Sequence, residues 1–167
     1  MTEVYFGLGS NIGNRRANLR AAIERTAPDV TIIAASDLYE SEPLPAPGID
    51  AQPTFLNAVA KAETSLDPDD LLVLVKNVER RLGRRPGVRW GPRPIDVDIL
   101  IFGDAAVATA ALTIPHTAIR ERSFVLAPLA DLAPDLVPPG WQGSVRDALR
   151  RLGTGGVRRV SGPEWMS

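Results

Sequence analysis

The chain has 167 residues, enough for one domain with a proper core and too few for us to expect two, so we predict a single domain over residues 1–167. Hydrophobic residues make up 44% and charged residues 23% of the sequence, which is ordinary for a globular protein and excludes a disordered or fibrous one. The formal net charge of −1 argues against nucleic acid as a partner, and a chain with no cysteine and one histidine excludes disulfides, thiolate catalysis and histidine-rich zinc sites.

The predicted elements mix strands and helices. In chain order they are a strand at 4–8, a helix at 15–27, a strand at 31–39, a loop at 41–53, a strand at 55–63, a helix at 68–82, a loop at 84–94, a strand at 95–102, a turn at 114–116, helices at 124–134 and 144–152, and a basic tail. Asn14 and Asp67 are placed to cap the first two helices. Pro68 suits a first helical position, and Gly83 suits the residue after a last turn.

The order strand, helix, strand, strand, helix, strand resembles the split βαβ arrangement, an antiparallel sheet with helices on one face. With the later helical segments added, we predict an α+β, ferredoxin-like fold with helices packed on the faces of the sheet. The loops at 41–53 and 84–94 are rich in proline or glycine and flank the second helix with its preceding strand. We predict that they are two mobile active-site loops.

Two aspartates share one face of the strand at 95–102. Side chains two apart along a strand lie on the same side with Cα atoms roughly 6.5 to 7 Å apart, so Asp96 and Asp98 are able to converge on one ligand. The apolar neighbours expected on the opposite face are Ile95, Val97, Ile99 and Ile101. Two carboxylates this close raise one pKa unless a cation neutralises them, and ligation by oxygen alone favours magnesium over zinc. A bare pair of this kind would also fit two solvated aspartates, so the neighbouring residues must decide.

Arginine dominates the sequence just before this pair. The arginines between residues 80 and 93 are Arg80, Arg81, Arg84, Arg85, Arg89 and Arg93. Planar guanidinium groups bind phosphate oxygens in pairs, so carboxylates and arginines together predict a metal site for a polyphosphate substrate, with Trp90 as a stacking face. Arg80 and Arg81 are explained as well by a solvated helix end.

The usual nucleotide-binding motifs are absent. The run GLGSNIGN has one residue too many for GxGxxG and lacks the lysine of a P-loop, so we assign it a turn and a helix cap. His116 precedes two arginines and is either structural or a phosphate contact. Asn57, inside an apolar strand, is a candidate for reading a polar heterocycle, whereas Phe55 and Phe124 are most simply core residues.

Five segments occur in the order GSNIGN, YESEPL, FLNAV, RWGPRPIDVDILIFG and IPHTAIRERSFVLAPLADLAP. From about residue 4 to 138 they resemble 6-hydroxymethyl-7,8-dihydropterin pyrophosphokinase of folate biosynthesis. The resemblance implies an ATP-dependent diphosphotransferase that moves the β,γ-diphosphate of ATP as a unit to the hydroxymethyl group of the pterin and releases AMP. ATP and 6-hydroxymethyl-7,8-dihydropterin are then the small-molecule partners, and two magnesium ions are expected between Asp96, Asp98 and the phosphates.

The resemblance also implies which residues bind and act. For ATP they are Glu79, Arg84, Arg89, Trp90, Arg93, Ile99, His116, Thr117 and Arg122. For the pterin they are Ser41, Pro43, Leu44, Phe55, Asn57 and Phe124, with the two aromatic rings sandwiching the heterocycle. The implied catalytic residues are Arg84, Arg93 and Asp98. Arg84 and Arg85 are both candidates for the second phosphate contact, and either Asp98 or water could take the hydroxyl proton.

Two other functions fit the same residues. A non-catalytic ferredoxin-like module that senses a nucleotide would show no turnover, and a metal-dependent phosphohydrolase would form AMP or ADP from ATP without pterin. The amino-terminal segment has no basic stretch followed by a long apolar run. We therefore expect a cytoplasmic, monomeric protein with no membrane partner.

Overall fold

The computed structural model describes residues 1–43, 48, 51–84 and 93–167. Within these residues, one antiparallel sheet contains β1 (Thr2–Ser10), β2 (Val30–Ala35), β3 (Leu38–Ser41), β4 (Phe55–Thr64), β5 (Asp96–Phe102) and β8 (Val157–Ser161). A separate hairpin pairs β6 (Val107–Ala108) with β7 (Thr113–Ile114). The helices are α1 (Arg15–Glu24), α2 (Pro68–Arg81), α3 (Ser123–Leu132) and α4 (Val145–Leu152), with short 3-10 turns η1 (Ile119–Glu121) and η2 (Pro163–Met166).

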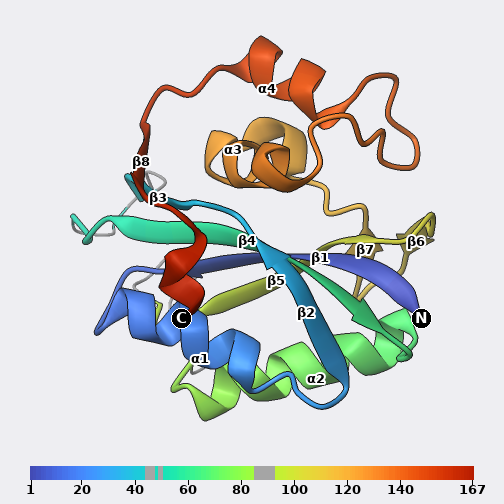
Figure 1. Ribbon diagram of the computed structural model, residues 1–167, viewed down its shortest axis with the longest axis horizontal. Helices are drawn as coiled ribbons and strands as arrows, with labels where there is room; N and C mark the ends of the chain where they lie inside the picture. The colour runs from blue at the N-terminus through green and yellow to red at the C-terminus, as the bar shows by residue number, and fades with distance from the viewer. Residues whose placement is uncertain (44–47, 49–50, 85–92) are drawn as a thin grey trace.

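The sheet has the strand order β5-β1-β4-β3-β8, and β2 also pairs with β4 (Figure 1). β1 lies between β4 and β5 and is antiparallel to both. Because β2 and β3 together occupy one place beside β4, the succession β1, α1, β2 with β3, β4, α2, β5 is that of a split βαβ fold. The predicted α+β, ferredoxin-like class is confirmed.

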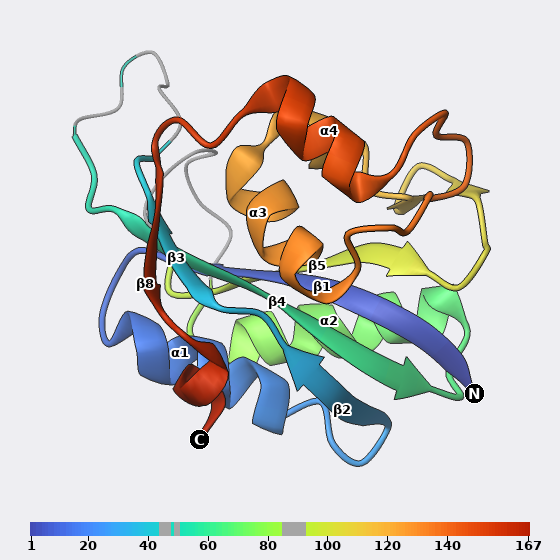
Figure 2. The same ribbon diagram turned by 45° about the horizontal axis from the view of Figure 1, so that its top comes forward.

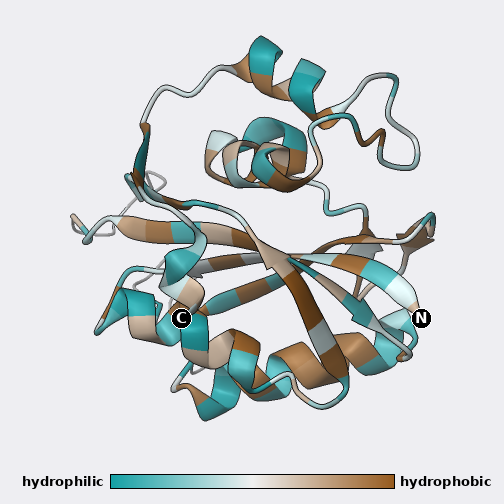
Figure 3. Ribbon diagram, viewed as in Figure 1, coloured by the Kyte–Doolittle hydropathy of each residue, from teal (hydrophilic) through white to brown (hydrophobic). Residues whose placement is uncertain are grey.

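Helices cover both faces of this sheet (Figure 2). α1 and α2 pack on one face, where Leu19 and Val75 join a buried cluster with Phe6. α3 and α4 lie on the other face, where Leu126 and Val145 join a second cluster. Figure 3 shows apolar residues along the strands between the two layers. Among the described helices, none is both long enough and apolar enough to cross a membrane.

Capping residues set the helix starts as the sequence predicts. The Asn14 side chain accepts a hydrogen bond from the backbone of Ala17 at 3.1 Å, and Asp67 accepts one from Asp70 at 2.8 Å. The end of α1 was predicted wrongly. It ends at Glu24 instead of residue 27, and the backbone bonding there changes from four-residue to three-residue spacing, with the Thr26 N–H 3.1 Å and the Thr26 hydroxyl 2.7 Å from the Ile23 carbonyl.

The predicted strand at 31–39 is two strands, and Ser36 explains the break. Its backbone N–H donates to the Val59 carbonyl at 2.9 Å, and its hydroxyl accepts from the Val59 N–H at 2.8 Å. Ser36 thus bonds to both the N–H and the carbonyl of Val59 on β4. The regular pairing of β2 with β4 stops there, and pairing with β4 resumes in β3. The carboxy-terminal residues, predicted only as a basic tail, form β8 on the edge of the sheet and η2.

The alternation predicted along β5 fails at Ile101. The pairing with β1 shifts between Tyr5 and Phe6, so that Ile101 faces Tyr5 while Ile99 faces Phe6. Leu100 is therefore an extra residue, and it joins the same cluster as Ile101 on the side of α3. Ile101 was predicted on the face of Val97 and Ile99, and the bulge moves it to the other face.

Candidate active site

The aspartate pair lies at the start of β5. Asp96 pairs with Gly9 and Asp98 pairs with Gly7 on the neighbouring strand β1. Neither partner has a side chain, and all four residues line one cavity. The Leu100 side chain lies beside Gly7, where an added Cβ would be 3.2 Å from Leu100 Cδ2. The two aspartates therefore share a face of the strand, as its periodicity predicts.

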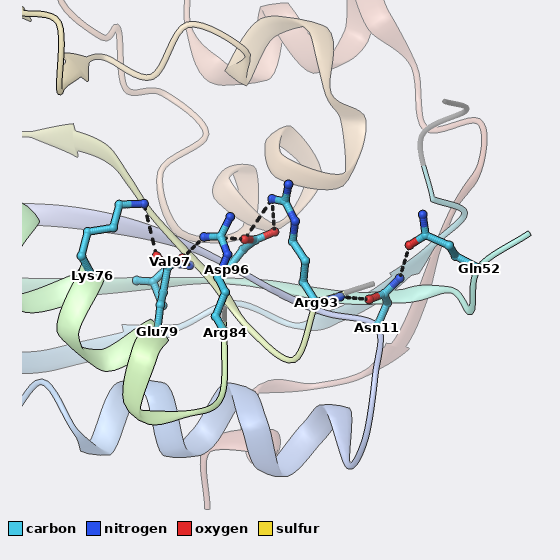
Figure 4. A network of polar contacts seen from close by, with 8 residues as sticks. All are labelled: Asn11, Gln52, Lys76, Glu79, Arg84, Arg93, Asp96 and Val97. Atoms are coloured by element: carbon cyan, nitrogen blue, oxygen red, sulfur yellow. Dashed lines mark hydrogen bonds and ion pairs between the residues drawn. The ribbon is translucent and has the colours of Figure 1, made fainter. Parts of the chain in front are cut away.

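Positive charge surrounds Asp96 (Figure 4). Its Oδ1 lies 3.0 Å from Arg84 Nη1 and 3.1 Å from Arg93 Nη1, and its Oδ2 lies 3.2 Å from Arg93 Nη1. Behind Asp96, the buried carboxylate of Glu79 accepts from Arg84 Nη1 at 2.6 Å and from Lys76 Nζ at 3.2 Å. Cations and carboxylates thus alternate from Lys76 to Arg93.

Asp98 lies in a different environment from Asp96. Burial is the main cause that raises the pKa of Asp98 above the ordinary aspartate range. The positive field of His116 lowers this pKa, the charges of Asp96 and Glu79 raise it, and Lys76 lowers it. A cation placed beside Asp98 would favour its charged form, so the site has the electrostatics of a cation site.

The cavity in front of the aspartates, here called the aromatic pocket, has aromatic, polar and charged walls. The predicted site residues that line it are Ser41, Pro43, Phe55, Asn57, Arg93, Asp96, Asp98, Arg122 and Phe124. Inside it, Asn57 Nδ2 donates to Ser41 Oγ at 2.8 Å, and both side chains are buried. The Arg122 guanidinium lies 5.7 Å from the centre of the Phe124 ring. Flat apolar faces beside a fixed amide suit a planar polar heterocycle.

A second pocket lies on the other side of Asp98. It is bounded by α2, by β5 and by the turn between β6 and β7, and we call it the hairpin pocket. Its lining includes Leu72, Lys76, Val97, Asp98, Ile99, Leu112, Thr113, His116 and Thr117. Asp98 lines both pockets, so the two pockets adjoin at this residue.

Residues 5–134 match the sequence profile of the family described as 7,8-dihydro-6-hydroxymethylpterin-pyrophosphokinase, abbreviated HPPK. The chain belongs to this family. Among HPPK relatives, the 2-amino-4-hydroxy-6-hydroxymethyldihydropteridine pyrophosphokinase of Methylorubrum extorquens is 44% identical over 162 residues, which cover 96% of this chain and 99% of that protein. The protein of the same name from Aquifex aeolicus is 40% identical over 147 residues, covering 88% of this chain and 90% of that one.

A solved structure gives the same fold. The HPPK-DHPS protein of Plasmodium falciparum, solved with pteroate, superimposes with a TM-score of 0.76 at 15% identity, covering 95% of this chain. This chain spans 45% of that longer chain. The HPPK family match confirms the resemblance seen in the motifs and the enzyme class, a pyrophosphokinase of folate biosynthesis with ATP as co-substrate. A non-catalytic sensing module does not fit this family.

Two polar residues near the HPPK site were missed as site residues in the sequence. Lys76 lines the hairpin pocket and lies three residues before Glu79 on α2, so helical spacing was an available signal. Asn11 had been assigned to a turn, yet its Oδ1 accepts from Arg93 N at 2.7 Å and its Nδ2 donates to Gln52 Oε1 at 3.1 Å (Figure 4). These partners are 82 and 41 residues away in sequence, so no local pattern marks them.

Some predicted HPPK site residues lie outside the described part of the chain. They are Leu44 in the first predicted loop and Arg89 and Trp90 in the second, together with the alternative phosphate contact Arg85. More broadly, residues 44–47, 49–50 and 85–92 of the two predicted loops are not described. Ser41 had been assigned to the first loop but ends strand β3, paired with Phe55.

Proposed function

We propose that this HPPK transfers the β,γ-diphosphate of ATP as a unit to the hydroxymethyl oxygen of 6-hydroxymethyl-7,8-dihydropterin at the junction of the aromatic and hairpin pockets. The observation that supports this most is the position of Asp98, which lines both pockets. A transfer between two bound substrates requires adjoining sites, and positioning supplies most of the catalysis that phosphoryl transfer needs.

The aromatic pocket is our proposed pterin site. Its proposed binding residues are Ser41, Pro43, Leu44, Phe55, Asn57 and Phe124. Phe55 and Phe124 offer apolar faces for stacking, and the hydrogen bond between Asn57 and Ser41 fixes the rotamer of the Asn57 amide. An amide fixed in this way is able to recognise the edge of the pterin ring without losing side-chain entropy on binding.

The hairpin pocket and the arginines near it form our proposed nucleotide site. The residues proposed for ATP are Glu79, Arg84, Arg89, Trp90, Arg93, Ile99, His116, Thr117 and Arg122. Arg84 and Arg93 already lie at Asp96, so they are close to where the phosphates would meet the aspartates. We predict that one of Arg84 and Arg85 makes the second phosphate contact, and both residues remain candidates.

Asp96 and Asp98 are the proposed ligands of two magnesium ions. The raised pKa of Asp98 and its proximity to the negative charge of Asp96 support a cation there, and the donors are all oxygen. Within the described residues, no group of three or more acidic or histidine side chains could hold a metal by itself, so phosphate and water oxygens would complete the coordination. A magnesium ion held by Asp96 and Asp98 would supply positive charge to offset the charge of the phosphates.

The residues of the chain have separate roles in the proposed reaction. The pocket walls orient the hydroxymethyl group toward the β-phosphorus, and Arg84 and Arg93 balance charge that develops on the transferred group. Asp98 or water accepts the hydroxyl proton. A single domain over residues 1–167, a monomeric state, a cytoplasmic location and the absence of nucleic-acid or membrane partners also stay predictions.

The Asp98→Ala variant tests this function. With ATP, pterin and magnesium present, we expect AMP release to fall by at least roughly 10²-fold, because the residue shared by both pockets is lost. The fold should remain, since a carboxyl with a raised pKa is not a source of stability at neutral pH. The control is Asp104→Ala, which removes an exposed carboxylate just after β5. Full activity of Asp98→Ala would overturn the assignment.

A further inference from the structure

We propose that Glu79 is a positioning residue of the phosphate site, which holds Arg84, Lys76 and the Val97 amide in place, and that this role replaces the direct ATP contact that the family resemblance implies for it. This inference rests on the proposed function and deepens it. The nucleotide side of the site carries several cations that would bind phosphate. Glu79 is the carboxylate that connects two of these cations with the backbone of the aspartate strand (Figure 4).

Glu79 stands out by its burial. It is 2% exposed, and the other buried polar side chains of the described residues are uncharged. Leaving a buried carboxylate without hydrogen-bond donors costs free energy, and the Glu79 carboxylate has three donors as partners. Its Oε2 accepts from Arg84 Nη1 at 2.6 Å and from the Val97 N–H at 2.9 Å, and its Oε1 accepts from Lys76 Nζ at 3.2 Å. These protein donors use about three of the four acceptor positions of the carboxylate, and its burial leaves little surface for a ribose hydroxyl to reach.

The contact with Arg84 fixes a guanidinium group. Arg84 Nη1 lies between two carboxylates, 2.6 Å from Glu79 Oε2 and 3.0 Å from Asp96 Oδ1. A guanidinium is planar, so anchoring one amino group restricts the plane of the whole fork. Among the described residues, Nη1 is the only guanidinium nitrogen of Arg84 with a bonded partner, so the donors on Nε and Nη2 are able to bind phosphate oxygens. If Asp96 exchanges its contact with Arg84 for a contact with a cation, the ion pair with Glu79 still holds Arg84 in place.

The other two contacts extend this arrangement to both sides. The Val97 N–H belongs to the residue between Asp96 and Asp98, so its bond to Glu79 fixes the backbone from which both carboxylates project. Lys76 lies one turn earlier on α2, and its half-exposed side chain lines the hairpin pocket. One carboxylate therefore sets the positions of two cations and one strand before substrate binds, which is electrostatic preorganisation.

A double-mutant cycle separates positioning from direct contact. Glu79→Gln keeps the side-chain shape and removes the charge, so we expect kcat to fall roughly 10- to 100-fold while KM for pterin changes by less than about 2-fold. If Glu79 acts mainly through Arg84, its effect is largely lost in the Arg84→Ala background, where Glu79→Gln should change kcat by less than about 3-fold. Glu24→Gln, which removes an exposed carboxylate on α1, is the matched control.

Other results would overturn the inference. Additive effects of Glu79→Gln and Arg84→Ala would mean that Glu79 does not act through Arg84. If Glu79→Gln weakens the use of ATP but not that of 2′-deoxy-ATP, Glu79 binds the ribose directly. Should Glu79→Gln fail to fold, Glu79→Asp retracts the carboxylate while keeping its charge and enters the same cycle, with the same outcomes. A wild-type enzyme that releases no AMP with pterin would overturn the proposed function itself, whereas an active wild type with an additive cycle overturns only the role of Glu79.

Discussion

Arg93 lines the aromatic pocket and is held there by Asp96, with Nη1 3.1 Å from Oδ1 and 3.2 Å from Oδ2. Its backbone is fixed as well, because Asn11 bonds to both its N–H and its carbonyl. A guanidinium placed this way is ordered before substrate arrives. It should therefore act on the charge of the transferred group more than on the neutral pterin ring.

Replacing Arg93 by alanine tests this role. We expect kcat to fall by roughly 10² to 10³-fold, while the dissociation constant for pterin, measured by titration, changes by less than about 3-fold. Arg81→Ala, at the exposed end of α2, should leave both quantities unchanged. A large loss of pterin affinity with an unchanged kcat would contradict the proposed role of Arg93.

At the residue scale, local patterns predicted the charged groups but not their partners. Strand alternation was enough to put Asp96 and Asp98 on one face, because that rule involves only neighbouring residues. The ion pairs of Arg84 with Glu79 and Asp96 depend on how α2 packs against β5, which no local pattern contains. The same holds for Asn11, whose partners lie in two distant loops.

Among the secondary-structure elements, the carboxy-terminal segment is the one that the sequence described least well. β8 pairs with β3, the strand that ends at Ser41, and η2 places Trp165 in the core. Both lie beyond residues 5–134 that match the HPPK family. The starts of α1 and α2 were predicted well because the caps Asn14 and Asp67 and the proline Pro68 mark them locally. An edge strand with basic residues carries no such mark, because its stability comes from the strand that it pairs with.

Trp165→Phe tests how strongly this segment is anchored. Trp165 is 1% exposed, and its Nε1 donates to the buried Ser36 carbonyl at 2.8 Å. Phenylalanine removes that donor and leaves the carbonyl unpaired, so we expect the free energy of unfolding, measured by urea denaturation, to fall by about 1–3 kcal/mol. Trp141→Phe, at a partly exposed ring beneath Arg120, should cost less than about 1 kcal/mol. Equal stability of Trp165→Phe and the wild type would show that η2 does not stabilise the fold.

At the scale of the whole molecule, the sheet separates two helical layers while one strand end serves two pockets. Asp98 on β5 lines both pockets, and the glycines that lie opposite the two aspartates on β1 line the aromatic pocket. The order of strands and helices, read from the sequence, was enough to predict this fold class. The bulge at Leu100 and the break at Ser36 could not be predicted, since both depend on pairing between strands.

The most direct test of transfer at this junction is a ³¹P NMR spectrum of the completed reaction with ATP, pterin and magnesium. If the β,γ-diphosphate moves as a unit, AMP and a pterin diphosphate appear in equal amounts, the latter as two coupled phosphorus signals. Omitting pterin should leave the ATP intact. Formation of ADP with a pterin monophosphate, or of AMP and inorganic diphosphate without pterin, would contradict the proposal that the two pockets bring these substrates together at Asp98.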